Sequence, residues 1–248
     1  MPAHPSADPA TSPAPIEPAG QPASLRLPAT LLLAGQLFYI AVTLLHTGGD
    51  ANDHHDVFAE YAHSGSWTFV HLGQFVGMAL FLAGLLALSS ALTGPPQVTA
   101  RLGAAAATAT LALYGALQAV DGVALKQAVT AWADAPDGEK AARFAAAEAI
   151  RWLEWGLRSY QNLTLGLALL LIAAAVARAA RIPRPIAALM ALAGLTYLVQ
   201  GWVVGTDGFS HTESLAIVAA YALDLAWMTW LAVAARRTPA ADASMPRR

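Results

Sequence analysis

The sequence predicts an all-α polytopic membrane protein, a bundle of six transmembrane helices with both termini in the cytoplasm (N-in/C-in). Hydrophobic residues make up 56% of the 248 positions and charged residues only 12%, about half the charged fraction of a soluble domain. Six separate apolar stretches approach the ~20 residues that a helix needs to cross a bilayer. Lysine and arginine gather at one set of stretch ends, which is typical of the cytoplasmic side.

The six predicted spans are separated by turn-forming or polar segments. In order they are residues 27–46, 67–92, 102–123, 157–177, 186–204 and 214–235. Pro28 and Pro185 stand near helix starts, where a missing N–H group is harmless. The Gly94-Pro95-Pro96 segment marks a turn between the second and third spans.

Three parts of the chain are therefore predicted. Residues 27–236 form the transmembrane domain. The Pro- and Ala-rich residues 1–26 and the segment 237–248 are expected to be disordered cytoplasmic tails, because they bury too little apolar surface to offset the entropy of ordering.

The distribution of positive charge predicts the orientation. Nine arginines fall on the side predicted to be cytoplasmic, namely Arg26, Arg101, Arg178, Arg181, Arg184, Arg236, Arg237, Arg247 and Arg248. Five basic residues fall on the other side, namely Lys126, Lys140, Arg143, Arg151 and Arg158. Nine against five favours both termini inside.

Composition and motifs exclude several function classes. The net charge of −2 gives no electrostatic reason to expect nucleic acid as a partner. The chain has no cysteine, which excludes disulfides, thiolate metal sites and a cysteine nucleophile. It also lacks the glycine patterns of nucleotide sites and of serine hydrolases. The lipid bilayer is the expected partner, and no cofactor is indicated.

Polar side chains cluster at the predicted outer ends of the helices. The candidate residues for an outward-facing polar cleft are His71, Gln74, Gln118, Asp121, Glu154, Arg158 and Gln200. His71 and Gln74 are three residues apart, as are Gln118 and Asp121, so each pair shares a helix face. Polar groups at membrane depth usually face the bundle interior and mark a site.

Charge pairing offers a structural alternative for the same residues. Glu154 and Arg158 can pair along one helix at i, i+4, and Asp121 would then need Arg151, Arg158 or Lys126. Such a network could serve only to lock two helices together.

Three residues next to helix ends are expected to be solvated and to have no such role. They are His46, His211 and Glu213.

Asp224 is the intramembrane acid, about halfway through the sixth span. An isolated carboxylate there costs roughly 2.5–3.5 kcal/mol. It is expected either to carry a proton or bind a ligand, or to be a neutral carboxyl group bonded to a facing helix, for example through Gln36.

The first predicted outer loop supplies a weak metal hypothesis. If residues 56–63 are helical, Asp56, Glu60 and His63 share one face at i, i+4 and i+7. No paired-histidine motif accompanies them, and acidic loops of this kind are usually just solvated.

The second span carries a stripe of small residues. Gly73 and Gly77 form a GxxxG pattern and Gly84 continues it seven residues further, which predicts close packing against a neighbouring helix.

Several segments resemble bacterial six-helix membrane proteins of unknown function. The segments are FAEYA (58–62), HLGQF (71–75), QAVDG (118–122), RWLEWG (151–156) and QGW (200–202). The resemblance covers most of residues 27–236. It implies the fold and no activity. The expected location of the chain is the bacterial cytoplasmic membrane.

Three functions remain open for the predicted cleft. The first is binding of a small polar or amphipathic ligand. The second is a membrane-embedded enzyme that uses the same groups for acid–base or metal-assisted chemistry. The third is a scaffold or assembly subunit with structural charges. Transport is disfavoured because the predicted inner halves hold few polar groups.

Overall fold

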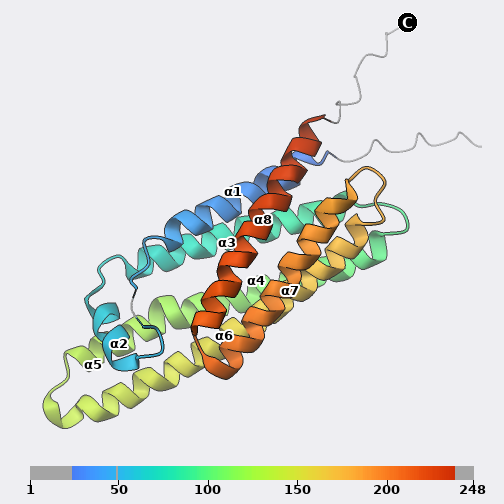
Figure 1. Ribbon diagram of the computed structural model, residues 1–248. Helices are drawn as coiled ribbons and strands as arrows, with labels where there is room; N and C mark the ends of the chain where they lie inside the picture. The colour runs from blue at the N-terminus through green and yellow to red at the C-terminus, as the bar shows by residue number, and fades with distance from the viewer. Residues whose placement is uncertain (1–23, 49, 238–248) are drawn as a thin grey trace, which may run out of the picture.

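The structure is a computed structural model that describes residues 24–48 and 50–237. These residues form helices and no strands, and six of the helices are long and apolar enough to cross a membrane (Figure 1). The prediction of an all-α bundle of six membrane-spanning helices is confirmed. Most of the two predicted tails (1–26 and 237–248) lies outside the described residues.

The membrane-spanning helices follow the predicted order along the chain. They are α1 (Arg26–Thr43), α3 (Trp67–Ala91), α4 (Gln97–Ala119) with its continuation through η1 (Val120–Leu125) and α5 (Lys126–Ala133), α6 (Asp137–Val176), α7 (Arg184–Asp207) and α8 (His211–Arg237). A short helix, α2 (His54–His63), lies between α1 and α3.

The third and fourth helical segments are longer than the predicted spans. The third continues to Ala133 and the fourth already begins at Asp137. Hydropathy marks only the stretch that fits within a bilayer, whereas the added turns pack on α2 in a separate apolar cluster that includes Phe58, Leu125 and Val129.

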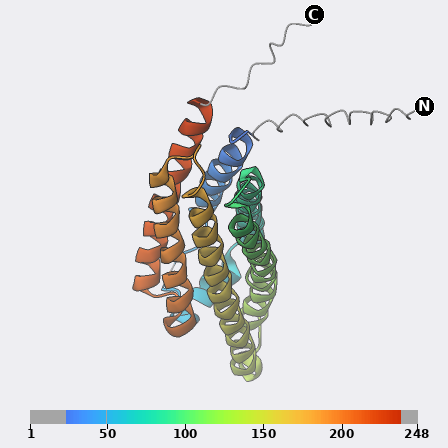
Figure 2. The ribbon, with the colours of Figure 1, turned by 90° about the vertical axis from the view of Figure 1, so that its right-hand side faces the viewer.

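The six long helices form a ring in chain order. Each packs against the next, and α8 closes the ring against α1 (Figures 1 and 2). The start of α1 and the end of α8 lie at one end of the bundle, together with the α3–α4 and α6–α7 loops. We call this the arginine-rich end, because it carries Arg26, Arg101, Arg178, Arg181, Arg184, Arg236 and Arg237. We call the opposite end the α2 end.

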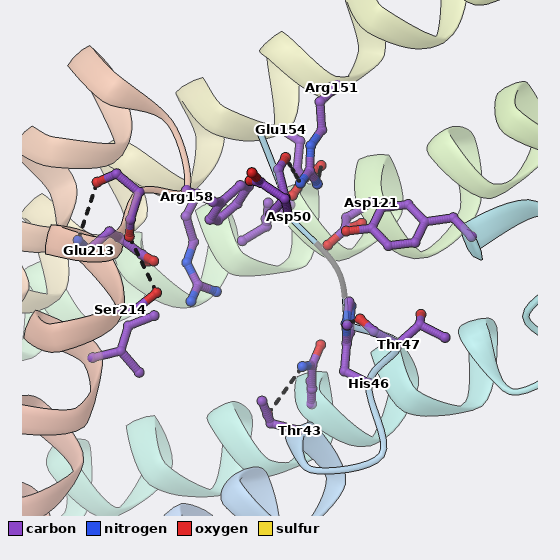
Figure 3. A pocket seen from close by; sticks show the side chains of 18 of the residues that line it. Thr43, His46, Thr47, Asp50, Asp121, Arg151, Glu154, Arg158, Glu213 and Ser214 are labelled. Atoms are coloured by element: carbon purple, nitrogen blue, oxygen red, sulfur yellow. Dashed lines mark hydrogen bonds and ion pairs between the residues drawn. The ribbon is translucent and has the colours of Figure 1, made fainter. Parts of the chain in front are cut away.

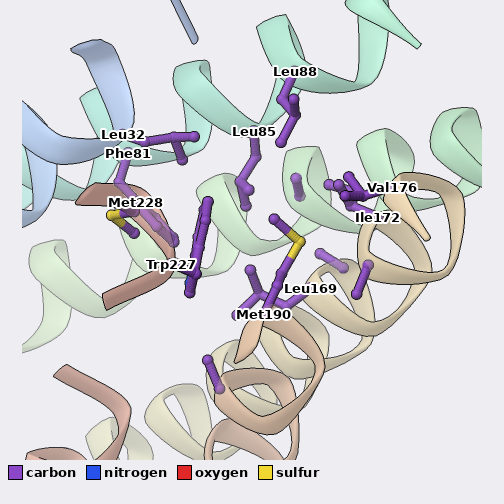
Figure 4. Close-up of a cluster of buried hydrophobic side chains, with 14 of the residues drawn as sticks. Leu32, Phe81, Leu85, Leu88, Leu169, Ile172, Val176, Met190, Trp227 and Met228 are labelled. Atoms are coloured by element: carbon purple, nitrogen blue, oxygen red, sulfur yellow. The ribbon is translucent and has the colours of Figure 1, made fainter. Parts of the chain in front are cut away.

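Apolar side chains fill the interior toward the arginine-rich end. Leu85 from α3, Leu169 from α6, Met190 from α7 and Trp227 from α8 are all fully buried there (Figure 4). Such a core is packed as densely as an organic crystal. The polar site is therefore confined to the other half of the bundle.

The α2 helix is fixed to the bundle by polar contacts as well as apolar ones. Asp53 caps its N-terminus by accepting hydrogen bonds from the N–H groups of His55 and Asp56. The ammonium group of Lys126 donates to the carbonyl oxygens of Tyr61 (2.6 Å) and Ala62 (2.7 Å), where a helix leaves carbonyls unpaired. This helix forms one wall of the polar end.

Candidate functional site

A cavity of about 420 Å³ lies inside the ring at the α2 end. Helices α1, α3, α4 with η1, α6 and α8 enclose it, together with the loops that precede α2 and α8 (Figure 3). Of the predicted cleft residues, the cavity is lined by Gln74, Gln118, Asp121, Glu154 and Arg158. The structure thus brings together residues from three separate segments of the chain, namely α3, the continuous α4–η1 helix and α6.

Arg151 and Glu154 form a buried ion pair in the cavity wall. Their side chains are each 3% exposed, and Nη1 lies 2.7 Å from Oε2. The predicted pairing of Glu154 with Arg158 is therefore wrong: Glu154 pairs with the arginine one turn before it. Residues at i, i+3 and i, i+4 both share a helix face, so spacing alone did not distinguish the two partners.

Arg151 also joins three segments around the cavity. Its guanidinium donates to the carbonyl oxygen of Ala51 (3.1 Å) and lies over the rings of Phe209 (4.6 Å) and Tyr61 (5.6 Å). Cation–π contacts of this kind are strongest where water is excluded. Sequence reasoning considered Arg151 only as a partner for Asp121.

Asp121 pairs with His71, which was not among its expected partners. Oδ2 of Asp121 lies 3.0 Å from Nε2 of His71, and Nδ1 of His71 donates to the carbonyl oxygen of Trp67 (2.8 Å). The carbonyl only accepts, so Nδ1 carries a proton and the remaining proton lies between Nε2 and the carboxylate. The pair is neutral as a whole.

His71 lies behind the cavity wall instead of lining the cavity. It is 2% exposed, and Asp121 stands between it and the open space. The expectation that His71 lines the cleft is not met, nor is the alternative that it reaches out to the membrane interface.

Asp121 lies in a π-helix, whose turns are wider than those of an α-helix. Residues Val120–Leu125 form a π-helix, a conformation found mostly as single turns at functional sites. The indole N–H of Trp67 donates to the carbonyl oxygen of Asp121 (3.0 Å). Gly122 faces His71, and a Cβ at position 122 would lie 2.7 Å from the Cβ of His71. The missing side chain lets the two helices bring the pair together.

Arg158 reaches into the middle of the cavity (Figure 3). Its Nε is buried and has no hydrogen-bond partner. Within residues 24–48 and 50–237, no carboxylate oxygen lies within 4.0 Å of its guanidinium. Tyr39 and Glu213 line the same cavity.

Glu213 faces the same cavity from the first turn of α8. It is 2% exposed, and its Oε1 has no hydrogen-bond partner. The expectation that it is solvated is wrong. Ser210 and Glu213 have the spacing of a capping box, and the N–H of Glu213 does donate to Oγ of Ser210 (3.4 Å). The N–H of Ser210, however, donates to Gly208, which leaves the carboxyl group turned to the cavity.

Two amide side chains complete the polar wall. Gln74 donates through Nε2 to Oγ1 of Thr43 (3.2 Å). Gln118 lines the cavity, and its Oε1 is buried without a hydrogen-bond partner. Both amides can turn a donor or an acceptor toward a bound molecule.

His46 lines the cavity from the loop after α1. Its Nδ1 donates to the carbonyl oxygen of Thr47 (2.7 Å). Burial lowers its pKa below 6.5, and the charge of Asp121 partly opposes this shift. The prediction that His46 is solvated and has no role in the cleft did not include its contact with the cavity.

Gln200 and Asp224 lie away from the cavity. Gln200 is 2% exposed and donates to the carbonyl oxygen of Ala216 (3.2 Å), so it joins α7 to α8 and does not line the cleft as expected. Asp224 is fully buried and accepts hydrogen bonds from Tyr197 Oη (2.9 Å) and Trp227 Nε1 (2.9 Å). Its partners are these two residues, and the expected bond to Gln36 is not formed.

The weak metal candidates lie on α2, which is helical as that hypothesis required. His63 uses its Nδ1 to donate to the carbonyl oxygen of Ala59 (2.7 Å). Asp56, Glu60 and His63 do not form a group able to hold a metal ion, and no other group of three such side chains does so in the described part of the chain.

Comparison with known proteins agrees with the resemblance to uncharacterised proteins of unknown function. No curated protein and no solved structure matches the chain. Residues 96–234 match the model of a family described as a domain of unknown function (DUF4386). The match runs from the start of α4 into α8 and contains Asp121, Glu154, Arg158 and Glu213. Because it covers more than half of the 248 residues, the chain belongs to the DUF4386 family of uncharacterised proteins.

Proposed function

We propose that this membrane protein binds a small polar or amphipathic molecule in the cavity at the α2 end, which opens to the non-cytoplasmic side. The observation that carries the proposal is Arg158, whose guanidinium stands inside the cavity with no carboxylate within 4.0 Å among the described residues. A cation taken out of bulk water is costly unless it is paired. An oxyanion on a ligand supplies that partner, because guanidinium and carboxylate or phosphate form two parallel hydrogen bonds.

The contrast between the paired charges of the cavity wall and Arg158 supports ligand binding over a purely structural role for Arg158. A scaffold needs only pairs that lock helices together, such as Arg151–Glu154 and His71–Asp121. These two pairs fix the cavity wall. Arg158 joins neither of them, so helix packing does not account for it.

The apolar core favours binding over transport. A transporter needs polar access from both faces. Here the interior toward the arginine-rich end is filled by large buried side chains such as Leu85 and Trp227.

A membrane-embedded enzyme is the second candidate, favoured by the Asp121–His71 pair. A carboxylate in the cavity wall backed by an imidazole is able to exchange a proton with a bound molecule. It would use the same cavity and the same ligand. Recovery of a chemically altered ligand after incubation with the protein would favour this candidate.

The native chain has no cysteine, so single cysteines can probe the cavity directly. Ile217, half-buried on α8, lines it. We expect an Ile217→Cys variant in proteoliposomes to react with small methanethiosulfonate reagents, and to react faster with a sulfonate reagent than with a trimethylammonium reagent. The attraction comes from Arg158, so Arg158→Gln should abolish the preference.

Gly138→Cys is the matched control, because Gly138 is exposed at the start of α6 and lies outside the cavity. It should react with both reagents whether or not Arg158 is present. The proposal fails if Gly138→Cys reacts while Ile217→Cys does not, or if the charge preference at position 217 survives Arg158→Gln.

A further inference from the structure

We propose that the ligand is a zwitterion, with an oxyanion group held by Arg158 and an ammonium group held by Glu213. This inference rests on the proposed function and names the chemical class of its ligand. The observation behind it is that one cation and one carboxyl group that line the same cavity (Figure 3) have no oppositely charged partner within 4.0 Å among the described residues.

The other buried charges of the wall cancel in pairs. Arg151 lies 2.7 Å from Glu154, and His71 lies 3.0 Å from Asp121. A ligand that bound to either pair would have to break a contact that the protein already makes. Asp50 is a further carboxylate, but it stands at the exposed rim, where water solvates it.

Arg158 is suited to an oxyanion. A guanidinium presents its N–H donors as a planar fork that matches the two oxygens of a carboxylate or the oxygens of a phosphate. Its Nε is buried without an acceptor. An acceptor brought by the ligand would satisfy it.

Glu213 is suited to an ammonium group. Its carboxyl group is buried, its Oε1 has no donor, and the capping bond that would have occupied it is not made. An ammonium group has three donors and no acceptor. Such a group would satisfy the carboxylate and cancel its charge.

The two side chains that would bind the ligand's charged groups lie on different helices. Arg158 is on α6 and Glu213 on α8, and no nitrogen–oxygen distance between them falls within 4.0 Å. Both side chains line the cavity, as do the amides of Gln74 and Gln118. An oxyanion and an ammonium group occur together in free amino acids and in the phosphoethanolamine headgroup of a lipid. Both sources share this chemistry.

The test uses protection of Ile217→Cys from the sulfonate reagent, in the full chain in proteoliposomes. The probes are L-leucine and glycerophosphoethanolamine, each compared with analogues that lack one charge. N-acetyl-L-leucine and glycerol phosphate lack the ammonium group, and L-leucinamide lacks the carboxylate. We expect millimolar L-leucine or glycerophosphoethanolamine to protect, and the single-charge analogues to bind roughly ten- to hundredfold more weakly. The probe that protects identifies the source.

Variants that remove one charge show which side chain binds each charged group of the ligand. In Glu213→Gln, N-acetyl-L-leucine or glycerol phosphate should bind as well as its parent zwitterion. In Arg158→Gln, L-leucinamide should bind as well as L-leucine. Glu139→Gln, an exposed change on α6, should leave both unchanged. Glu213→Asp and Arg158→Lys keep the charges and should show intermediate affinities, which separates loss of a charge from loss of the fold.

Two results would overturn the proposal that the ligand is a zwitterion. One is protection by a single-charge analogue that equals protection by its parent, and the other is the absence of protection by either zwitterion. Both leave the proposed function standing if Ile217→Cys still reacts with the charge preference described above. If position 217 cannot be modified at all, the proposed function itself has failed.

Discussion

Arg151 joins three parts of the cavity wall. Its guanidinium contacts the α1–α2 loop through Ala51, the α7–α8 loop through Phe209, and Glu154 on its own helix. It is 3% exposed. A charge buried to this degree is tolerated only with excellent geometry, and these contacts provide it.

The first prediction concerns the Arg151–Glu154 ion pair. Arg151→Gln should lower the free energy of unfolding by roughly 3–5 kcal/mol, because it strands the buried charge of Glu154. Thermal unfolding in detergent measures the effect. Arg143→Gln removes an exposed arginine from the same helix and its 3.1 Å pair with Glu139, and it should cost no more than about 1 kcal/mol. Equal losses in the two variants would contradict the structural role given to Arg151.

The second prediction concerns pH and His46. Burial is the largest cause of its lowered pKa; Asp121 opposes the shift, and His71 and Arg151 add to it. The folded state therefore favours the neutral ring, so its contribution to stability is present above pH 6.5 and is lost as the pH falls below that value.

His46→Gln should reduce the fall in melting temperature between about pH 7 and about pH 5. His55→Gln is the control, because the His55 side chain is 76% exposed, and it should leave the pH dependence unchanged. An unaltered pH profile in His46→Gln would show that another group is responsible.

At the scale of residues, the sequence predicted which charges belong to the site better than it predicted their partners. Asp121, Glu154 and Arg158 stood out because they lie in or beside apolar spans, and unpaired charges at membrane depth are costly. Glu213 was misjudged because a charge beside a helix end resembles a solvated one. The partner of Glu154 depends on the loops that hold Arg151 through Ala51 and Phe209. The partner of Asp121 depends on the π-helix, and the residue pattern specifies neither.

At the scale of elements, the glycines of α3 set its distance from α1. The predicted close packing is confirmed: Gly73 faces Val42, Gly77 faces Tyr39 and Gly84 faces Leu32. A Cβ at Gly77 would lie 2.9 Å from the Cα of Tyr39. The neighbouring atom belongs to the backbone, so it cannot move aside as a side chain can.

The third prediction follows from this contact. Gly77→Leu should destabilise the bundle by roughly 1–3 kcal/mol or more through overpacking. It should also disturb the cavity, which Tyr39 lines. Gly115→Ala on α4 is the control, because its new Cβ would meet only Phe75 at 3.6 Å and alanine favours a helix. Equal melting temperatures for the two variants would contradict this packing.

The elements themselves were only partly predictable. Apolar stretches of bilayer length predicted the six spans, because hydropathy reports burial in lipid. The extra turns of α5 and of the start of α6 escaped prediction because they pack on α2 and not on lipid. The π-helix has no sequence signature, although Gly122 marks the close approach that it permits.

At the scale of the whole molecule, the charge distribution predicts which end faces the cytoplasm. Single cysteines at Gly138, toward the α2 end, and at exposed Thr93, beside the arginine-rich end, test it in the cysteine-free chain. An impermeant maleimide added to intact cells should label Gly138→Cys and spare Thr93→Cys, because arginines are retained on the cytoplasmic side. The reverse labelling would turn the cavity toward the cytoplasm and refute the proposed orientation.

An experimental structure of the protein purified in its own lipids tests the central claim most directly. The claim is that the cavity at the α2 end holds a small molecule on Arg158. We expect density that is not protein within hydrogen-bonding distance of the Arg158 guanidinium, and we expect the Glu213 carboxyl group to contact the same density. A direct Arg158–Glu213 ion pair, with the cavity closed between the two side chains, would contradict it.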